Sequence, residues 1–317
     1  KDTIAPTGTI AQGVGAKQIN SKGEVYETKY GLTTSERVYG TVMENLQGRG
    51  PCYLRTEGIS PQQDESLRKA YLNMAPSQTL KWVEAGKDPS RQNVEIEGTE
   101  PYIVGGHTAS GYWVDTNRQT TINGLYAAGD VAGGCPQKYV TGAMVEGEIA
   151  ALDMINKLDK EEKNADFENV GETEQKAFDE KVNEYNSFLA GKTQQFTTEA
   201  IEEAMQKVMD NYAGGISTHY QFNEKQLELA DEKIRQLIRL VDGLHADDMH
   251  DLMFVYELKE RLTVCLSVIA HLGARKETRW HSFAENLDHP DKSDEWMKYV
   301  NSKYIDGKLQ IIYRDLV

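Results

Sequence analysis

The spacing of apolar residues changes part-way along the chain. Up to about residue 130, short apolar runs alternate with stretches of helical spacing, a pattern typical of mixed α/β structure. From Thr141 onward, apolar residues mostly recur at the helical spacing of three or four positions. The pattern therefore predicts a fold class of α/β plus all-α, with the all-helical part second.

The first clear helix is predicted from Ser35, whose side chain is placed to cap it. Val38, Val42 and Leu46 give this helix an apolar face, and Gly48 ends it. Two more helices are predicted over 60–74 and 77–85, and strands over 51–56, 93–98, 101–107, 112–115 and 125–128.

The all-helical part is predicted to begin with a helix near Thr141, followed by a charge-rich linker over 159–175. Helices are then predicted over 228–244 and 251–274, and about the last 35 residues are predicted to be irregular. The helix over 251–274 is apolar almost all round, so we expect it at the centre of a bundle, with Met253, Phe254 and Val255 in the core. The first helix carries these apolar residues at near-helical spacing: Met144, Ile149, Ala150, Leu152 and Ile155.

Composition excludes some classes of function. The 317 residues are 39% hydrophobic and 27% charged, and the net charge is −15. Such an acidic chain lacks the positive face that displaces counterions from nucleic acid, so we expect no nucleic-acid binding. The sequence contains no apolar run of about 18 residues and opens without the apolar stretch of a signal peptide. We therefore expect a cytoplasmic protein with no membrane span.

The cysteines exclude another kind of chemistry. Cys52, Cys135 and Cys265 are far apart, and the sequence contains no Cys-x-x-Cys pair. Iron–sulfur clusters and disulfide frameworks need more cysteines at closer spacing. We expect no metal site in this chain, and any iron–sulfur cluster would belong to a partner.

The stretch "GLYAAGD" at 124–130 is the strongest chemical signal. It predicts a strand of small and apolar residues that ends at Gly129 and Asp130, ahead of a helix N-terminus near Thr141. Gly129 lets the backbone turn tightly, and the Asp130 carboxylate is suited to accept hydrogen bonds from sugar-like hydroxyls. The helix N-terminus offers free N–H groups to an electron-rich ligand. Either a ligand site or an Asp that merely caps a turn satisfies this pattern.

The motifs "YIVGGH", "TTINGLYAAGD", "GAMVEGEIAA" and "ARKETRW" resemble the succinate dehydrogenase/fumarate reductase flavoprotein superfamily. Within it, they are most similar to the alpha subunits of dissimilatory adenylylsulfate reductases. The resemblance covers roughly residues 30–290 and implies that Asp130 holds the ribityl chain of FAD. It also implies that Gly105, Gly106 and Gly129 approach the cofactor. Thr141, Gly142 and Ala143 would offer N–H groups to the flavin pyrimidine.

The same resemblance implies that part of the flavin site lies elsewhere. Such flavoproteins hold the ADP half of FAD with a strand, a G-x-G-x-x-G turn and a helix, and no G-x-G-x-x-G occurs in this sequence. We therefore expect a C-terminal half of a longer flavoprotein. Its expected parts are a partial capping domain over 1–100, the return segment of a Rossmann-like FAD domain over 101–160, and a helical domain with an irregular tail over 161–317.

The resemblance implies a catalytic role for His107, which follows Gly105 and Gly106. As an imidazole it would donate a hydrogen bond to a sulfonyl oxygen or act as an acid, although a histidine at a strand end also commonly satisfies backbone carbonyls. Tyr139 would stack near a substrate adenine, and Lys138 would face an anion or solvent. These three residues are the candidate catalytic and substrate-binding groups.

Three charged clusters have functional and structural interpretations. Arg275, Glu277, Arg279 and His281 match a superfamily run near the active site, but an ion-pair network is the favoured role. Arg49 and Arg55 flank a predicted strand and would either face substrate or serve the fold. His245 and His250 stand among aspartates, a pattern that favours helix capping over a metal site.

The function implied by the resemblance is the reduction of adenosine 5′-phosphosulfate to sulfite and AMP, with FAD as cofactor and a separate iron–sulfur, ferredoxin-like beta subunit as electron donor. A fumarate reductase or succinate dehydrogenase-like enzyme acting on another small anion is the enzyme alternative. The expected carboxylate-binding arginine of those enzymes is missing, because no arginine stands between Arg118 and Arg235. An inactive fragment without the ADP-binding half is the third alternative.

Overall fold

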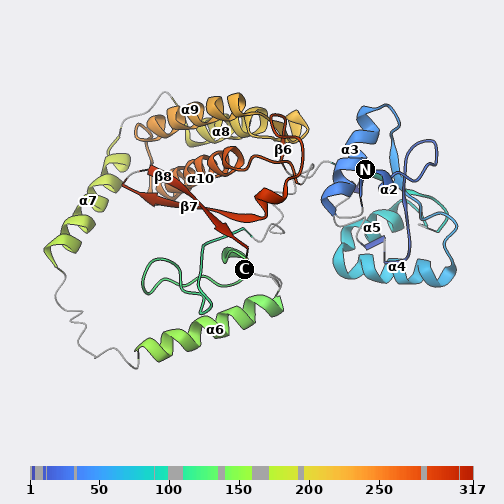
Figure 1. Cartoon of the computed structure of the whole chain (residues 1–317), viewed down its shortest axis with the longest axis horizontal. Coiled ribbons are helices and arrows are strands. Elements are labelled where there is room, and N and C mark those ends of the chain that lie inside the picture. The colour runs from blue at the N-terminus through green and yellow to red at the C-terminus, as the bar shows by residue number, and fades with distance from the viewer. Residues whose placement is uncertain are drawn as a thin grey trace. The chain divides into compact units, whose positions relative to one another are not determined.

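The structure is a computed structural model that describes residues 2–3, 10–11, 13–31, 34–88, 90–98, 110–134, 140–158, 171–191, 196–279, 284–306 and 308–316. The chain divides into two compact units (Figure 1). The first comprises Lys1–Tyr102, Asp210–Gln226 and Lys276–Trp296. The second comprises Ile103–Met209, Leu227–Arg275 and Met297–Val317.

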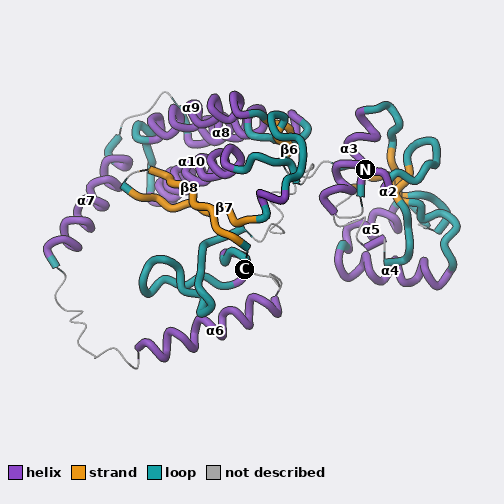
Figure 2. Tube along the Cα trace, in the orientation of Figure 1, coloured by secondary structure: helices purple, strands orange, loops and turns teal. Residues whose placement is uncertain are grey.

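The first unit contains a small sheet of four strands: β1 (Asp2–Thr3), β2 (Gln18–Ile19), β3 (Cys52–Leu54) and β4 (Val94–Glu97). Their order in the sheet is β1–β4–β3–β2. Figure 2 shows strands of this unit in orange among its helices. β4 runs parallel to β1 and antiparallel to β3, which is antiparallel to β2. Cys52, Leu54, Val94 and Ile96 are buried, as expected where alternate residues of a strand face one core. β3 and β4 confirm two of the predicted strands.

Four helices accompany this sheet: α2 (Glu27–Tyr30), α3 (Thr34–Leu46), α4 (Pro61–Met74) and α5 (Pro76–Glu84). The Ser60 hydroxyl accepts from the Gln63 N–H while the Gln63 side chain accepts from the Ser60 N–H, which fixes the start of α4. Tyr71 of α4 meets Trp82 of α5 edge to face, with ring centroids 4.8 Å apart. Both rings join Leu67 in the core of the unit. The predicted helices over 60–74 and 77–85 are confirmed.

A second small sheet in the first unit pairs β5 (Gln221–Phe222) with β6 (Glu285–Asn286) in parallel. Two single turns of 3₁₀ helix, η3 (Ile216–Thr218) and η4 (Asp294–Trp296), lie near it in sequence. Thr278 ties this region together, because its hydroxyl donates to the His289 carbonyl at 2.9 Å and accepts from the Asn286 N–H at 2.9 Å.

Helices dominate the second unit, as predicted. They are α6 (Val140–Leu158), α7 (Glu172–Leu189), α10 (Met249–Ala274) and most of α8 (Thr198–Tyr212) and α9 (Glu224–Val241). α10 buries Val255, Leu258 and Leu262, but Met253 and Phe254 are 46% and 42% exposed, so their predicted core positions are wrong. Helical geometry explains the difference, because consecutive residues point about 100° apart and cannot all face one core. Among the described helices, none is long and apolar enough to cross a bilayer.

The end of the chain forms a β-hairpin instead of the predicted irregular tail. β7 (Lys298–Ile305) and β8 (Lys308–Asp315) pair antiparallel, from Lys298 opposite Asp315 to Ile305 opposite Lys308. The hairpin contacts α10, where the His271 Nε2 lies 2.9 Å from the Ser302 Oγ. The Arg314 guanidinium stacks 3.9 Å from the centre of the Trp113 ring, which links the last strand to the 110–134 segment.

Candidate functional site

The Gly129–Asp130 turn is a single turn of 3₁₀ helix, η2 (Gly129–Val131). Gly129 has φ +74°, a conformation that costs other residues backbone strain, and the Ala132 N–H donates to its carbonyl at 3.0 Å. The segment before the turn forms isolated bridges, including Gln119 opposite Tyr126, rather than the two predicted strands. Leu125 is 48% exposed, so the expected buried strand is here a loop, which backbone hydrogen bonds such as Thr120 N–H to the Leu125 carbonyl hold in place.

α6 holds the turn through a buried carboxylate. The Gly129 N–H donates to the Glu146 Oε2 at 3.0 Å, and the Arg118 Nε lies 3.2 Å from the Glu146 Oε1 as an ion pair. Glu146 is only 5% exposed. A Cβ on Gly129 would lie 3.1 Å from the Ala143 Cβ, so the turn and the helix approach each other closely. Gly129 therefore contributes to the turn through its backbone conformation and its lack of a Cβ. Its N–H is not free for a ligand, because it is bonded to Glu146.

A second polar contact fixes the same segment further along α6. The Tyr126 hydroxyl donates to the Asp153 Oδ2 at 2.6 Å, and the Lys157 Nζ lies 2.7 Å from that oxygen. The Lys157 ammonium also donates to the Tyr126 hydroxyl at 3.0 Å. The hydrogen bond to Asp153 raises the pKa of Tyr126, and the same carboxylate raises the pKa of Lys157. The 110–134 segment is thus attached to α6 at two places along the helix: at Glu146, and roughly two to three turns later at Asp153 and Lys157.

Asp130 is exposed at the tip of the turn, next to the buried Gly129. The Gly129 backbone lies close to Ala143, so these two predicted cofactor residues come together, with Asp130 following Gly129 in the sequence. Thr141 is exposed and Gly142 is buried in the first turn of α6, where backbone N–H groups lack partners within the helix. Five predicted residues lie outside the described parts of the chain: Gly105, Gly106, His107, Lys138 and Tyr139.

Arg118 and Glu146 are site residues that the sequence predictions did not include. Glu146 lies between apolar neighbours in "AMVEGEIAA", where a charged residue inside an apolar helical run is a signal of a specific buried contact. Arg118 has φ +70°, and its carbonyl accepts the Ala127 N–H at 3.0 Å. The Asp115 side chain fixes the turn before Arg118 by accepting from the Asn117 and Gln119 N–H groups.

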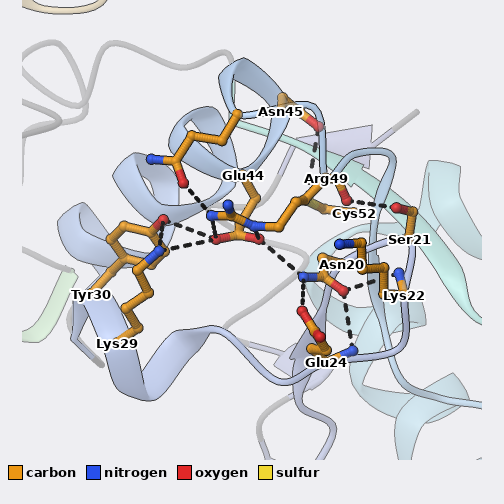
Figure 3. Close-up of polar contacts among 11 residues, drawn as sticks. Asn20, Ser21, Lys22, Glu24, Lys29, Tyr30, Glu44, Asn45, Arg49 and Cys52 are labelled. Atoms are coloured by element: carbon orange, nitrogen blue, oxygen red, sulfur yellow. Dashed lines mark hydrogen bonds and ion pairs between the residues drawn. The ribbon is translucent and has the colours of Figure 1, made fainter.

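Arg49 belongs to a buried polar cluster in the first unit (Figure 3). Its Nε and Nη2 donate to the two Glu44 oxygens at 2.6 and 2.5 Å. The Asn20 amide and the Tyr30 hydroxyl donate to the same carboxylate at 3.1 and 2.9 Å. These donors, Arg49 first, lower the pKa of Glu44 to about 2. Arg55 Nη2 donates to the Gly23 carbonyl at 2.6 Å. Arg49 and Arg55 therefore both have structural roles.

The other charged clusters also have structural roles. Arg279 makes two 2.8 Å hydrogen bonds to the buried Glu277 carboxylate, which also accepts the Ser293 N–H at 3.0 Å. This supports the favoured ion-pair role of that cluster, and His281 lies outside the described residues. Asp248 caps α10 by accepting from the His250 and Asp251 N–H groups. Within the described chain no group of His, Cys, Asp and Glu is placed to hold a metal ion.

Comparisons with known proteins show which proteins the chain is similar to. No protein-family model matches the chain. The alpha subunit of adenylylsulfate reductase from Megalodesulfovibrio gigas is 26% identical over 97% of this chain and 55% of its own length. The chain is a homologue of adenylylsulfate reductase alpha subunits. An uncharacterised FAD-dependent oxidoreductase from Methanocaldococcus jannaschii is 25% identical over 92% of the chain and 53% of its own length.

Solved structures agree with this homology. Adenylylsulfate reductase from Archaeoglobus fulgidus matches with a TM-score of 0.73 and 27% identity, over 99% of this chain and 57% of its own. An E. coli quinol fumarate reductase matches with a TM-score of 0.70 at 18% identity, over 98% of this chain and 55% of its own, which shows a shared fold. The chain therefore has the fold of flavoprotein oxidoreductases and spans about half the length of the relatives it matches.

Proposed function

We propose that this chain is the C-terminal part of an FAD-dependent oxidoreductase that reduces adenosine 5′-phosphosulfate to sulfite and AMP. The observation that carries the proposal is the match to adenylylsulfate reductases over nearly the whole chain. A solved adenosine 5′-phosphosulfate reductase in this group is a complex with sulfite as a covalent adduct. The Gly129–Asp130 turn supports the proposal, because Glu146 of α6 holds it and the Asp130 carboxylate is left exposed to a ligand.

The proposed architecture follows the flavoprotein plan. Residues 1–100 form a partial capping domain, 101–160 the return segment of a Rossmann-like FAD domain, and 161–317 a helical domain. The β7–β8 hairpin would end the helical domain. The part that holds the ADP half of FAD would lie outside this chain, which spans about half the length of the relatives it matches.

The described residues fit FAD. The exposed Asp130 carboxylate is suited to accept hydrogen bonds from the ribityl hydroxyls, because it sits at the tip of a turn that Glu146 holds still. The N–H groups of Thr141, Gly142 and Ala143 lie in the first turn of α6, where they would stabilise negative charge on the flavin pyrimidine. Bound there, FAD would supply two-electron redox chemistry.

The substrate step requires two electrons at the sulfur atom. They break the bond between sulfur and the bridging oxygen, so sulfite is released and AMP keeps that oxygen. His107 would donate a hydrogen bond or a proton to an oxygen of the reacting group. Tyr139 would stack on the adenine, and Lys138 would face the anionic phosphosulfate. A ferredoxin-like iron–sulfur beta subunit would supply the electrons, and the cytoplasmic location stays a prediction.

The full-length protein, purified under mild conditions, tests the proposal. It should show the visible absorption of a flavin, which should bleach when sulfite and AMP are added together. His107→Ala should lower turnover by about 10²-fold or more with FAD still bound, as loss of a general acid does. His250→Ala is the matched control, because that imidazole lies at the exposed start of α10. Bleaching by succinate instead would reject the sulfur reaction in favour of the dicarboxylate alternative.

The chain on its own gives a separate test. Because half of the flavin site is missing from it, the purified chain should bind no stoichiometric FAD. Asp130→Ala in the full-length protein should weaken FAD binding, since the substitution removes an acceptor for sugar hydroxyls. A purified chain that is yellow, or an Asp130→Ala protein with unchanged FAD affinity, would contradict the proposed cofactor site.

A further inference from the structure

Arg118 and Glu146 close a ring of contacts around the Gly129–Asp130 turn. The Arg118 carbonyl accepts the Ala127 N–H at 3.0 Å, two residues before Gly129. The Gly129 N–H donates to the Glu146 Oε2 at 3.0 Å, and the Glu146 Oε1 lies 3.2 Å from the Arg118 Nε. Each member of the pair therefore contacts the segment that ends at the turn, and each also contacts the other.

The ring itself does not require the charges of the pair. A neutral amide in place of the Glu146 carboxylate would still offer an oxygen to the Gly129 N–H. The Glu146 side chain is only 6% exposed, and burying a charge costs more free energy than burying a neutral group that makes the same hydrogen bond. The structural role of the pair therefore does not explain why the pair is ionic.

The backbone brings Arg118 to Glu146 in an unusual conformation. Arg118 has φ +70°, in the left-handed region that residues with a Cβ rarely adopt. The Asp115 side chain fixes this conformation by accepting from the Asn117 and Gln119 N–H groups, and the Arg118 N–H donates to the Asp115 carbonyl at 3.1 Å. Strain of this kind persists only where surrounding contacts impose it. The position of the Arg118 side chain is therefore set by its own turn as well as by Glu146.

The pair lies about one helical turn from the groups that the proposed function places against the flavin. Glu146 follows Ala143 by three residues in α6, a rise of about 4.5 Å along the helix. The Gly129 turn reaches the same place, because a Cβ on Gly129 would lie 3.1 Å from the Ala143 Cβ. Salt screens buried charges weakly over such distances. An uncompensated charge at Arg118 or Glu146 would therefore act on a flavin bound at the first turn of α6.

The two charges would act on that flavin in opposite directions. Reduction adds negative charge to the flavin pyrimidine, so a nearby carboxylate disfavours reduction and a nearby guanidinium favours it. An unpaired Glu146 carboxylate would thus oppose the N–H groups at the start of α6, which favour negative charge on the ring. The Arg118 guanidinium cancels this opposition.

We infer that Arg118 is a positioning residue that keeps the flavin easy to reduce, because it neutralises the carboxylate that holds the Gly129 turn. The inference rests on the proposed function only in taking the cofactor to be a flavin. The two members of the pair then have separate tasks. Glu146 fixes the turn, and Arg118 cancels the negative charge that Glu146 brings to the site.

The reduction potential of the flavin in the full-length protein tests this inference, measured without oxygen against a reference dye. Arg118→Gln should lower the potential, because it leaves the Glu146 carboxylate unpaired. Glu146→Gln should raise it, because it leaves the Arg118 guanidinium unpaired. Each variant should change the ratio of reduced to oxidised flavin at a fixed potential about tenfold, which is about 30 mV for a two-electron couple.

The double variant Arg118→Gln/Glu146→Gln should return the potential close to that of the wild type. It contains neither charge, so its flavin is exposed to no uncompensated member of the pair. Together with Glu146→Gln it also keeps the inference testable if Arg118→Gln does not fold, since neither of these two variants buries an unpaired carboxylate.

Asp153→Asn and Lys157→Gln are the matched controls. The Lys157 Nζ lies 2.7 Å from the Asp153 Oδ2, and this pair also attaches the 110–134 segment to α6 through Tyr126. Asp153 follows Glu146 by seven residues, so it lies about 10 Å farther along the helix, beyond the screening length of about 8 Å at physiological salt. Each control should change the ratio of reduced to oxidised flavin less than about twofold.

Three results would overturn the inference. The first is a shift in the same direction in Arg118→Gln and Glu146→Gln, because loosening of the turn does not depend on the sign of the charge removed. The second is an unchanged potential in both variants. The third is a shift in Asp153→Asn or Lys157→Gln as large as those at the pair.

Failure of the proposed function is distinguishable. A flavoprotein that shows the opposite shifts but does not bleach with sulfite and AMP would reject the sulfur reaction and keep the role of Arg118. A flavoprotein that bleaches with sulfite and AMP but lacks the opposite shifts would keep the sulfur reaction and overturn the role of Arg118. A full-length protein that holds no flavin would reject both.

Discussion

The backbone N–H of Gly129 donates to the carboxylate of Glu146 in the second turn of α6, at 3.0 Å. The contact joins a turn of 3₁₀ helix to a helix that begins eleven residues later in the sequence. Because the carboxylate is buried and also paired with Arg118, it has little freedom to move. The turn that presents Asp130 is therefore fixed by α6 as well as by the backbone conformation of Gly129.

Removing the Glu146 carboxylate should release the turn. Glu146→Ala leaves the Gly129 N–H and the Arg118 guanidinium without this acceptor, which should cost about 1–3 kcal/mol. Glu146→Gln keeps an oxygen for the N–H and should cost less. Hydrogen exchange at the Gly129 amide in this chain measures the effect, and it should be fastest in Glu146→Ala. Equal exchange in the wild type and both variants would mean that Glu146 does not hold the turn.

Gly129→Ala should destabilise the chain for two reasons. The backbone is in the left-handed region, which costs an L-residue about 1–2 kcal/mol, and the new Cβ meets the Ala143 Cβ at 3.1 Å. Gly124→Ala is the matched control, because Gly124 has φ +78° but no atom within 4 Å of an added Cβ. Urea unfolding should therefore show a larger loss of unfolding free energy for Gly129→Ala than for Gly124→Ala. Equal losses of unfolding free energy would mean that the close approach of Gly129 to Ala143 of α6 does not affect stability.

Glu44 should make the first unit acid-sensitive. Its folded-state pKa is about 2, below the value near 4.3 of an unfolded glutamate. A lowered pKa contributes stability above pH 4.3 that is lost as the pH falls toward 2, and about 1–3 kcal/mol is expected. Glu44→Gln should remove this dependence at a cost in stability at pH 7. Glu65→Gln is the control, because Glu65 forms an exposed pair with Lys69. Urea unfolding at pH 2.5, 4 and 7 gives the comparison.

His271 should make the contact between α10 and the β7–β8 hairpin sensitive to mild acid. Burial, with the charge of Arg275, lowers the pKa of His271, so the folded state favours the neutral ring. Below about pH 6.5 the unfolded chain takes up a proton more readily than the folded chain. Stability should therefore decline as the pH falls below that value.

Hydrogen exchange in residues 298–315 at pH 7.5 and 5.5, corrected for the intrinsic pH dependence of exchange, measures this effect. Wild type should lose protection at pH 5.5, and His271→Gln should lose less because its amide still reaches Ser302 without titrating. His250→Gln, at an exposed position, should behave as wild type. A pH effect that survives in His271→Gln would assign it to another group.

The sequence predicted those elements whose signals are local. α4 was predicted over 60–74, and the structure shows a local signal at its start, because the capping box of Ser60 and Gln63 lies within four consecutive residues. The hairpin over 298–315 was missed, since its strands alternate polar and apolar residues only weakly and every residue stays partly exposed. A two-stranded hairpin of this kind depends on its contacts with α10, which no local pattern records.

The candidate site was predictable only in part. Gly129 and Asp130 stood out because a Gly-Asp pair at the end of a small apolar run has few structural uses. Arg118 and Glu146 did not stand out, because their meeting depends on how the 110–134 segment returns to α6. On α6 itself, the apolar positions Met144 and Ile155 were correctly placed on a helix, but both side chains are exposed, by 71% and 54%.

The stacking of Arg314 on Trp113 has a consequence for the order in which this polypeptide folds. During synthesis, Trp113 leaves the ribosome long before the last strand does. The segment that bears Asp130 cannot take up its complete packing while β8 is still being made. Trp113 can therefore gain this contact only after β8 has been made, and a ribosome stalled before β8 would hold a nascent chain without it.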